Sequence, residues 1–312
     1  MHSPDAETPA RQRVEPQLND LMSLYRPASL LPSWARSIRA NQAGGYLSAM
    51  KGRGMEYDES RPYQAGDDIR TLDWKVTART GKPHTKVFRE ERERPVYIGC
   101  DFSPSMFFAT RGVFKTVAAA RAAALIAWKA QQSGDRVGGL VFAANEHKEL
   151  PPERGKPGVI RFVKKLVDAG RIPKNPPIAA NSDALAKAVA RIKRIAKPGS
   201  LVFLVSDFRE FGDSCESDLV HLSRHNDLTC IFVYDPFEAA LPAASVKGQV
   251  TDGQTDVEIG FSDSKSSKRY ADNFTSRHDQ IEQLCRNNRI LFGRLATDDQ
   301  PLPILQRVLG LY

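Results

Sequence analysis

The sequence RPVYIGCD, residues 94–101, opens the most regular part of the chain. Its apolar run predicts a buried strand that ends at Asp101. The Ala- and Leu-rich stretch 113–134 predicts a long helix that Gly134 ends, and RVGGLVFA at 136–143 predicts the next strand. A strand, a helix and a strand in this order are typical of a parallel sheet covered by helices.

The same alternation continues toward the C-terminus. The apolar run SLVFLVSD, residues 200–207, has the continuous hydrophobicity of a strand buried on both faces. We therefore predict an α/β fold with a doubly wound, mostly parallel sheet. The other elements expected along this part are an edge strand near 146–152, helices over 158–170, 183–199 and 217–226, and a strand over 228–235.

Near the C-terminus the pattern is interrupted once. Residues 245–261 alternate polar and apolar side chains around Asp252-Gly253, which predicts a β-hairpin insertion. A helix over about 266–287, a strand over 289–297 and a short helix after Pro301 are expected to follow.

The N-terminal third has a different composition. Residues 1–20 are polar and contain prolines, so we expect a mobile tail. Residues 21–94 carry many charges and turn signals, which indicates an extension of short strands and loops packed on the main domain, residues 95–312.

Composition limits the classes of protein that the chain can belong to. Hydrophobic content of 41% and charged content of 26% are ordinary for a globular protein. No apolar stretch is long enough to span a bilayer, and the start lacks the apolar core of a secretory signal. The four cysteines lack metal-binding spacing, which favours free thiols in a reducing cytoplasm.

The net charge of +8 is unevenly distributed. Residues 151–200 contain twelve Lys and Arg against three Asp and Glu, whereas residues 201–250 contain three against eight. The basic segment is either a solvated helical face or an interaction surface. It lacks interleaved aromatic residues and any known nucleic-acid-binding module, which argues against a nucleic-acid partner.

Polar side chains gather where two predicted strands end. Asp101 is followed by Ser103 and Ser105, and Asp207 ends the later apolar run. Carboxyl ends of strands are where functional groups collect in doubly wound folds. Because all these donors are oxygens, a hard cation such as Mg²⁺ or Mn²⁺ is the expected ligand, although Asp101 and the serines could instead cap the helix that follows.

Enzyme motifs are not found at these positions. An aspartyl phosphotransferase usually has a second carboxylate where Ser103 stands, and Pro83 replaces the Ser or Thr of a phosphate-binding loop. No histidine falls at a motif position for activating a serine. We therefore expect a protein that is not an enzyme, with a metal-dependent hydrolase using the same aspartates as the alternative, and a nucleic-acid binder using the basic surface as a second.

The pattern Asp101-x-Ser103-x-Ser105 with a later Asp207 resembles the metal-ion-dependent adhesion site of von Willebrand factor A domains. The upstream segment 61–88 resembles the hallmark of the bacterial family called domain of unknown function fifty-eight, which joins such a segment to a von Willebrand A-like domain. The charged and aromatic residues of segment 61–88 form either a salt-bridged scaffold that docks the extension onto the sheet, or a partner-binding or catalytic surface. They are Arg61, Asp67, Asp68, Arg70, Asp73, Trp74 and Arg79.

The resemblance also implies a third hydroxyl ligand and a partner. Ser182 is the candidate, with Asp183 as a possible substitute, and Ser182 could equally be a helix N-cap. Family members are commonly encoded beside MoxR-type AAA+ ATPases. The expected function is therefore a metal-dependent protein-interaction module, an adaptor of such an ATPase that binds an acidic side chain of a client through its ion.

Overall fold

The structure, a computed structural model, describes residues 8–34, 55–90, 94–144, 146–172, 183–239, 247–251, 256–260 and 264–310. The chain forms two compact units. One comprises Met1–Ser37 with Arg94–Tyr312, and the other is Ile38–Glu93.

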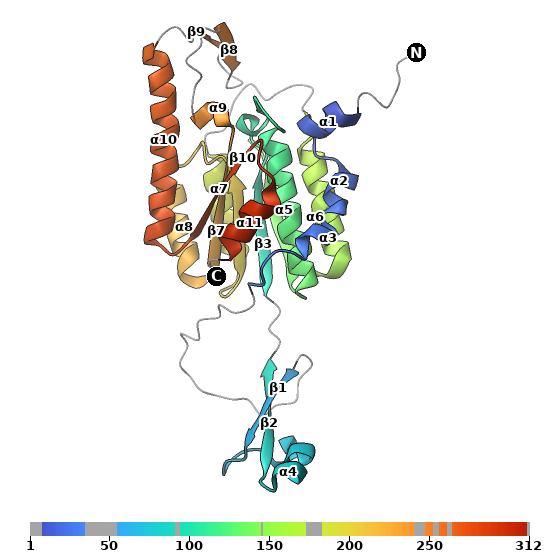
Figure 1. The fold of residues 1–312 in the computed structure, drawn as a ribbon. Coiled ribbons are helices and arrows are strands. Elements are labelled where there is room, and N and C mark those ends of the chain that lie inside the picture. The colour runs from blue at the N-terminus through green and yellow to red at the C-terminus, as the bar shows by residue number, and fades with distance from the viewer. Residues whose placement is uncertain are drawn as a thin grey trace. The chain divides into compact units, whose positions relative to one another are not determined.

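The large unit contains a six-stranded sheet in the order β10-β7-β6-β3-β4-β5 (Figure 1). Neighbouring strands are parallel except for the edge strand β5, which is antiparallel to β4. This confirms the predicted mostly parallel α/β fold. The strands are β3 (Pro95–Asp101), β4 (Arg136–Phe142), β5 (His147–Arg154), β6 (Leu201–Ser206), β7 (Asp227–Tyr234) and β10 (Leu291–Ala296).

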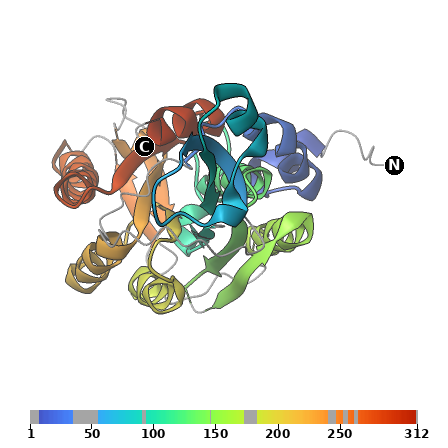
Figure 2. The same cartoon turned by 90° about the horizontal axis from the view of Figure 1, so that it is seen from below.

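Helices cover both faces of this sheet (Figure 2). Side chains alternate between the faces along each strand, so that Ile98 of β3 packs in one core and Tyr97 in the other. The first core holds α5 (Lys115–Gln132), α6 (Gly155–Ala169) and α11 (Pro301–Leu309). The second holds α7 (Ala184–Ile195), α8 (Asp213–His225) and α10 (Ser264–Asn287).

The N-terminal residues of the large unit form α1 (Thr8–Val14), α2 (Leu18–Ser23) and α3 (Tyr25–Ala28). The domain boundary differs from the sequence-based one, because residues from the expected tail and extension contact α5. Asp20 pairs with Arg121 at 2.8 Å, and the Trp128 indole donates to the Leu21 carbonyl at 3.0 Å. The charged Arg121 is tolerated in the otherwise apolar helix because Asp20 pairs with it.

The expected insertion is present as β8 (Lys247–Thr251) and β9 (Asp256–Gly260), which pair antiparallel. Asp252-Gly253, to which we assigned the turn, lies outside the described residues. A short helix, α9 (Pro236–Ala239), precedes this hairpin in the chain, and a 3₁₀ turn, η2 (Pro104–Met106), follows β3.

The small unit is built on an antiparallel pair, β1 (Met55–Pro62) and β2 (His84–Glu90), with η1 (Ile69–Thr71) and α4 (Trp74–Thr80) between them. Several charged residues of the 61–88 segment bond within the unit. The Arg61 guanidinium donates to the two carboxylate oxygens of Asp67 at 2.6 and 2.9 Å. Asp73 caps α4 by accepting from the backbone N–H groups of Lys75 and Val76. These contacts hold the small unit together internally, whereas Trp74 is 70% exposed.

Candidate functional site

Three aspartates stand at the carboxyl edge of the sheet, one for each of three neighbouring strands. Asp101 ends β3, Asp207 follows β6 and Asp235 follows β7. Since β7, β6 and β3 are adjacent and parallel, these strands end at the same edge. All three side chains are buried, which is costly for charged groups without partners.

Asp101 is held by hydrogen bonds and not by a cation. Its Oδ1 accepts from the Ser103 backbone N–H at 2.8 Å, and its Oδ2 accepts from the Ser206 hydroxyl at 2.6 Å. No ion pair to Asp101 is found in the described part of the chain. Burial, together with the nearby Asp207 carboxylate, raises the pKa of Asp101 to about 7, although hydrogen bonds from Ser103 and Ser206 act in the other direction.

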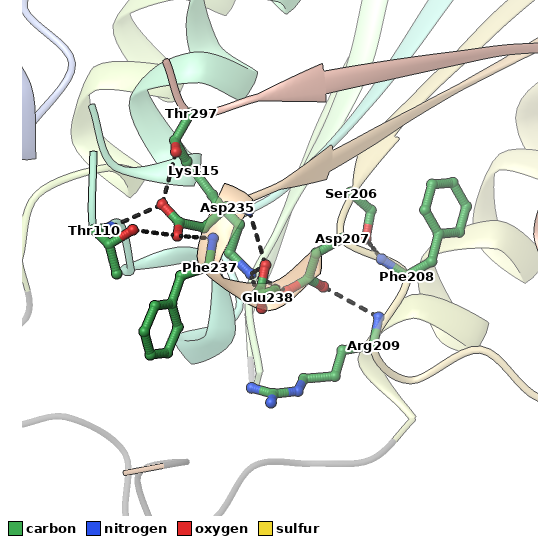
Figure 3. Close-up of polar contacts among 10 residues, drawn as sticks. All are labelled: Thr110, Lys115, Ser206, Asp207, Phe208, Arg209, Asp235, Phe237, Glu238 and Thr297. Carbon is green, nitrogen blue, oxygen red and sulfur yellow. Dashed lines mark hydrogen bonds and ion pairs between the residues drawn. The ribbon is translucent and has the colours of Figure 1, made fainter. Parts of the chain in front are cut away.

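Asp207 has a cationic partner from the start of α5 (Figure 3). The Lys115 ammonium is completely buried and lies 2.8 Å from Asp207 Oδ2. It also lies 3.0 and 3.1 Å from the two carboxylate oxygens of Glu238. Burial would disfavour the charged form of Asp207, but the adjacent ammonium outweighs it and lowers the pKa of Asp207 to about 2. The other oxygen, Oδ1, accepts from the Arg209 backbone N–H at 3.1 Å.

Asp235 joins the ends of β7 and β10 to the loop before α5 (Figure 3). It accepts from the Thr110 hydroxyl at 2.6 Å, the Thr110 N–H at 2.8 Å and the Thr297 hydroxyl at 2.7 Å. Gly112 of this loop has a φ of +70°, and a Cβ there would lie 2.1 Å from the Thr297 carbonyl oxygen. Only glycine fits that approach.

The structure brings part of the predicted metal set together. Asp101, Ser103 and Asp207 are buried at the edge, and Ser105 is half-buried in η2. Ser182 lies outside the described residues, and the exposed Asp183 makes no capping bond to α7. Glu210 instead caps that helix, because its Oε2 accepts from the Ala184 N–H at 3.1 Å.

The donor types fit a weakly bound hard cation. Asp101 supplies a carboxylate, and Ser103 and Ser105 supply neutral hydroxyls, which suit Mg²⁺ better than Zn²⁺. Asp207 is already paired with the Lys115 ammonium, which repels a second cation, so contact through water is its simplest contribution. The residues therefore fit a site with one directly bound carboxylate.

Sequence reasoning missed Lys115, Glu238, Asp235, Thr110 and Thr297. A signal was present for Asp235, because LTCIFVYD repeats the pattern of an apolar strand followed by aspartate seen at Asp101 and Asp207. Lys115 carried no such signal, since a lysine at a helix start is normally solvated.

A second group of possible metal ligands lies on α10. His278 Nδ1 is 2.9 Å from Asp279 Oδ1, and Glu282 is close to both. Asp279 is exposed and Glu282 half-buried, and the His278 ring packs among Phe232, Phe274 and Phe292. This arrangement is ordinary for a histidine at the margin of an aromatic core.

The fold and the strand-end oxygens define an α/β protein whose sheet edge has donors for a hard cation. Residues 59–280 match the family described as "Protein of unknown function DUF58", and this chain belongs to that family. No helix in the described part of the chain has the length and apolar content needed to cross a bilayer.

Curated relatives are similar over part of the chain. The uncharacterized proteins Mb1516 of Mycobacterium bovis and Rv1480 of Mycobacterium tuberculosis are each 30% identical over 200 residues. The match covers 64% of this chain and 61% of each relative, so the chain spans less than two thirds of their length.

Two solved structures share a similar arrangement of elements. An aerotolerance-related membrane protein from Bacteroides fragilis has a TM-score of 0.44 and 14% identity, over 70% of this chain and 100% of that one. The conserved hypothetical protein BatB from Bacteroides thetaiotaomicron has a TM-score of 0.37 and 16% identity, over 63% of this chain and 98% of its own.

Proposed function

We propose that this chain is a metal-dependent protein-interaction module with a von Willebrand A-like domain. In this proposal Asp101, Ser103 and Ser105 bind Mg²⁺ or Mn²⁺ directly, Asp207 acts through water, and Ser182 is a further hydroxyl candidate. The partner is a MoxR-type AAA+ ATPase for which the chain is an adaptor. Family resemblance supports the choice of partner.

The observation that carries the proposal is that neighbouring buried carboxylates differ in whether they have a cationic partner. The Lys115 ammonium pairs with both Asp207 and Glu238, whereas the buried Asp101 has no cationic partner in the described residues. A buried carboxylate without a cation is unfavourable when it is charged. A divalent cation at the strand end would remove this cost.

A bound Mg²⁺ would supply an electrophilic position that a partner carboxylate can fill. The chain's own residues prepare that position. The Ser103 N–H and the Ser206 hydroxyl orient Asp101, while Lys115 holds Asp207. Because the serine hydroxyls are neutral, much of the ion's charge stays available to the partner.

The test is Mn²⁺ binding by calorimetry to the wild-type protein and Asp101→Ala. We expect weak binding that the substitution abolishes. The matched control is Asp298→Ala, which removes an exposed carboxylate two residues after β10 and should leave Mn²⁺ affinity unchanged. Equal affinity in wild-type protein and Asp101→Ala would refute the proposed site. The adaptor role is tested separately, with immobilised MoxR-type ATPase in Mg²⁺ and in EDTA.

A further inference from the structure

A groove of about 360 Å³ lies between α7 and the hairpin of β4 and β5. Its floor is apolar and includes Leu140 and Phe142 from β4 and Ala184 and Ala188 from α7, all buried. The volume is at the lower end of the range for ligand sites in proteins. The groove can therefore receive an apolar side chain.

The groove exists because the helix presents small side chains to it. Leu185 and Val189 of α7 pack in the core against the sheet. Ala184, Ala188 and Ala190 line the groove, and Ala188 also belongs to that core. Methyl groups leave space between the helix and the hairpin that longer side chains would fill.

One rim of the groove is basic. Lys187, Arg191 and Arg194 line it at spacings of four and three residues, so they follow one side of α7. Arg191 is paired with Glu149 at 2.5 Å, but the charged groups of Lys187 and Arg194 have no partner within the described residues. Glu146 is the acidic lining residue, so the lining keeps an excess of positive charge.

The groove adjoins the proposed metal loop. The Phe142 carbonyl, at the end of β4, accepts from the N–H of Phe102 at 2.7 Å, and Phe102 stands between Asp101 and Ser103. A chain lying in the groove would thus reach the metal loop at this end.

We propose that this groove binds an acidic segment of the protein partner, with an apolar side chain on the alanine-lined floor and carboxylates against Lys187 and Arg194. The inference deepens the proposed function and rests on it for the nature of the partner. The acidic segment would continue from the groove to the Asp101 loop.

Geometry limits the segment to a short extended chain. The rim from Lys187 to Arg194 covers seven helical steps, about 10 Å, which is the length of about three extended residues. Addition of a strand to the sheet is disfavoured, because Pro151 and Pro152 in the edge strand β5 have no N–H to donate. The segment would therefore bind mainly through its side chains and not through backbone hydrogen bonds to the sheet.

The test measures fluorescence anisotropy of a labelled octapeptide of alternating Leu and Glu, with and without Mg²⁺. Two further peptides replace every Glu by Gln, or every Leu by Ser, and both should bind more weakly. The double variant Lys187→Glu/Arg194→Glu should weaken binding of the Leu-Glu peptide by about tenfold at low salt, because two attractive contacts become repulsive. The loss should shrink as salt rises.

The matched control is Lys164→Glu/Lys165→Glu on α6, which packs on the opposite face of the sheet and makes the same change in net charge. If both double variants weaken the peptide equally, or neither does, the groove is not the site. If a single-stranded oligonucleotide binds in a Lys187- and Arg194-dependent way and the peptide does not, the acidic-peptide proposal is wrong.

The two proposals fail in different ways. Asp101→Ala should remove only the Mg²⁺-dependent part of peptide binding and leave the effect of Lys187→Glu/Arg194→Glu. If Mg²⁺ and Asp101→Ala have no effect on peptide binding but Lys187→Glu/Arg194→Glu does, the groove proposal is supported and the metal-dependent function is refuted. If Mg²⁺ and Asp101→Ala change peptide binding but Lys187→Glu/Arg194→Glu does not, the metal-dependent function is supported and the groove proposal is refuted.

Discussion

The Lys115 ammonium lies 2.8 Å from Asp207 Oδ2, and the lysine is completely buried. The first residue of α5 thus supplies a fixed cation to the end of β6. Burial opposes the charge, yet the carboxylates of Asp207 and Glu238 raise the pKa of Lys115 above its ordinary value. Lys115 therefore stays charged, whereas Asp101 has no cationic partner among the described residues.

Replacing Lys115 should destabilise the protein strongly. Lys115→Met leaves the carboxylates of Asp207 and Glu238 buried without their cation, and loss of one partner of a buried pair costs about 3–5 kcal/mol. Urea denaturation measures the free energy of unfolding. Lys129→Met, on the same helix and partly exposed, is the control and should change it by less than about 0.5 kcal/mol. Similar values for the two variants would show that the ion pair contributes little.

Acid should weaken the contact made by Asp235. Burial disfavours its charged form, but the hydrogen bonds from Thr110 and Thr297 outweigh burial and hold the pKa of Asp235 below its ordinary value of 3.8. The unfolded chain then binds the proton more readily. The stability that Asp235 contributes is present above pH 3.8 and is lost as the pH falls through the lower folded pKa.

Asp235→Asn should lower stability at pH 7 and make the decline in acid shallower. Urea denaturation between about pH 2 and pH 7 checks both effects, because the loss falls below pH 3.8. Asp298→Asn, at an exposed position, should keep the wild-type slope. An unchanged slope in Asp235→Asn would mean that other carboxylates account for acid sensitivity.

Glu210 should be the stabilising cap of α7. It accepts from the Ala184 N–H, whereas Asp183 makes no capping bond. Glu210→Ala is expected to cost about 1 kcal/mol, as for loss of an ordinary N-cap. Asp183→Ala is the paired control, for which thermal unfolding should be nearly unchanged. A larger loss of stability in Asp183→Ala than in Glu210→Ala would show that Asp183, and not Glu210, caps the helix.

Purified protein should not turn over ATP or p-nitrophenyl phosphate in the presence of Mg²⁺. The reason is chemical, since the sequence has no recognisable nucleophile and base pair beside Asp101. Phosphate release is the measurement, and Asp101→Asn is the comparison. Turnover in the wild-type protein that Asp101→Asn abolishes would favour the hydrolase alternative.

The order and type of the elements in the large unit were predictable from local patterns. SLVFLVSD is apolar from Leu201 to Val205 and forms β6, which is buried along its length. The helical spacing of Leu185, Val189 and Ile192 predicted the buried face of α7. These patterns involve residues only a few positions apart, so they can be recognised without any knowledge of the fold.

Contacts between distant parts of the chain left no local signal. Lys115 and Asp207 are 92 positions apart, and Trp34 donates to Asp135 across 101. Nothing near Asp20 indicates that it pairs with Arg121 and fixes the N-terminal helices on α5.

The strand order explains this difference. Hydrophobic runs predict that parallel strands form, but any of several orders would bury the same side chains. Only the observed order, in which β6 lies between β7 and β3, places Asp207 beside Asp101 and within reach of Lys115. Which carboxylate receives the buried lysine therefore depends on long-range packing, because a charge in the core is stabilised only by groups that the fold brings within a few ångströms.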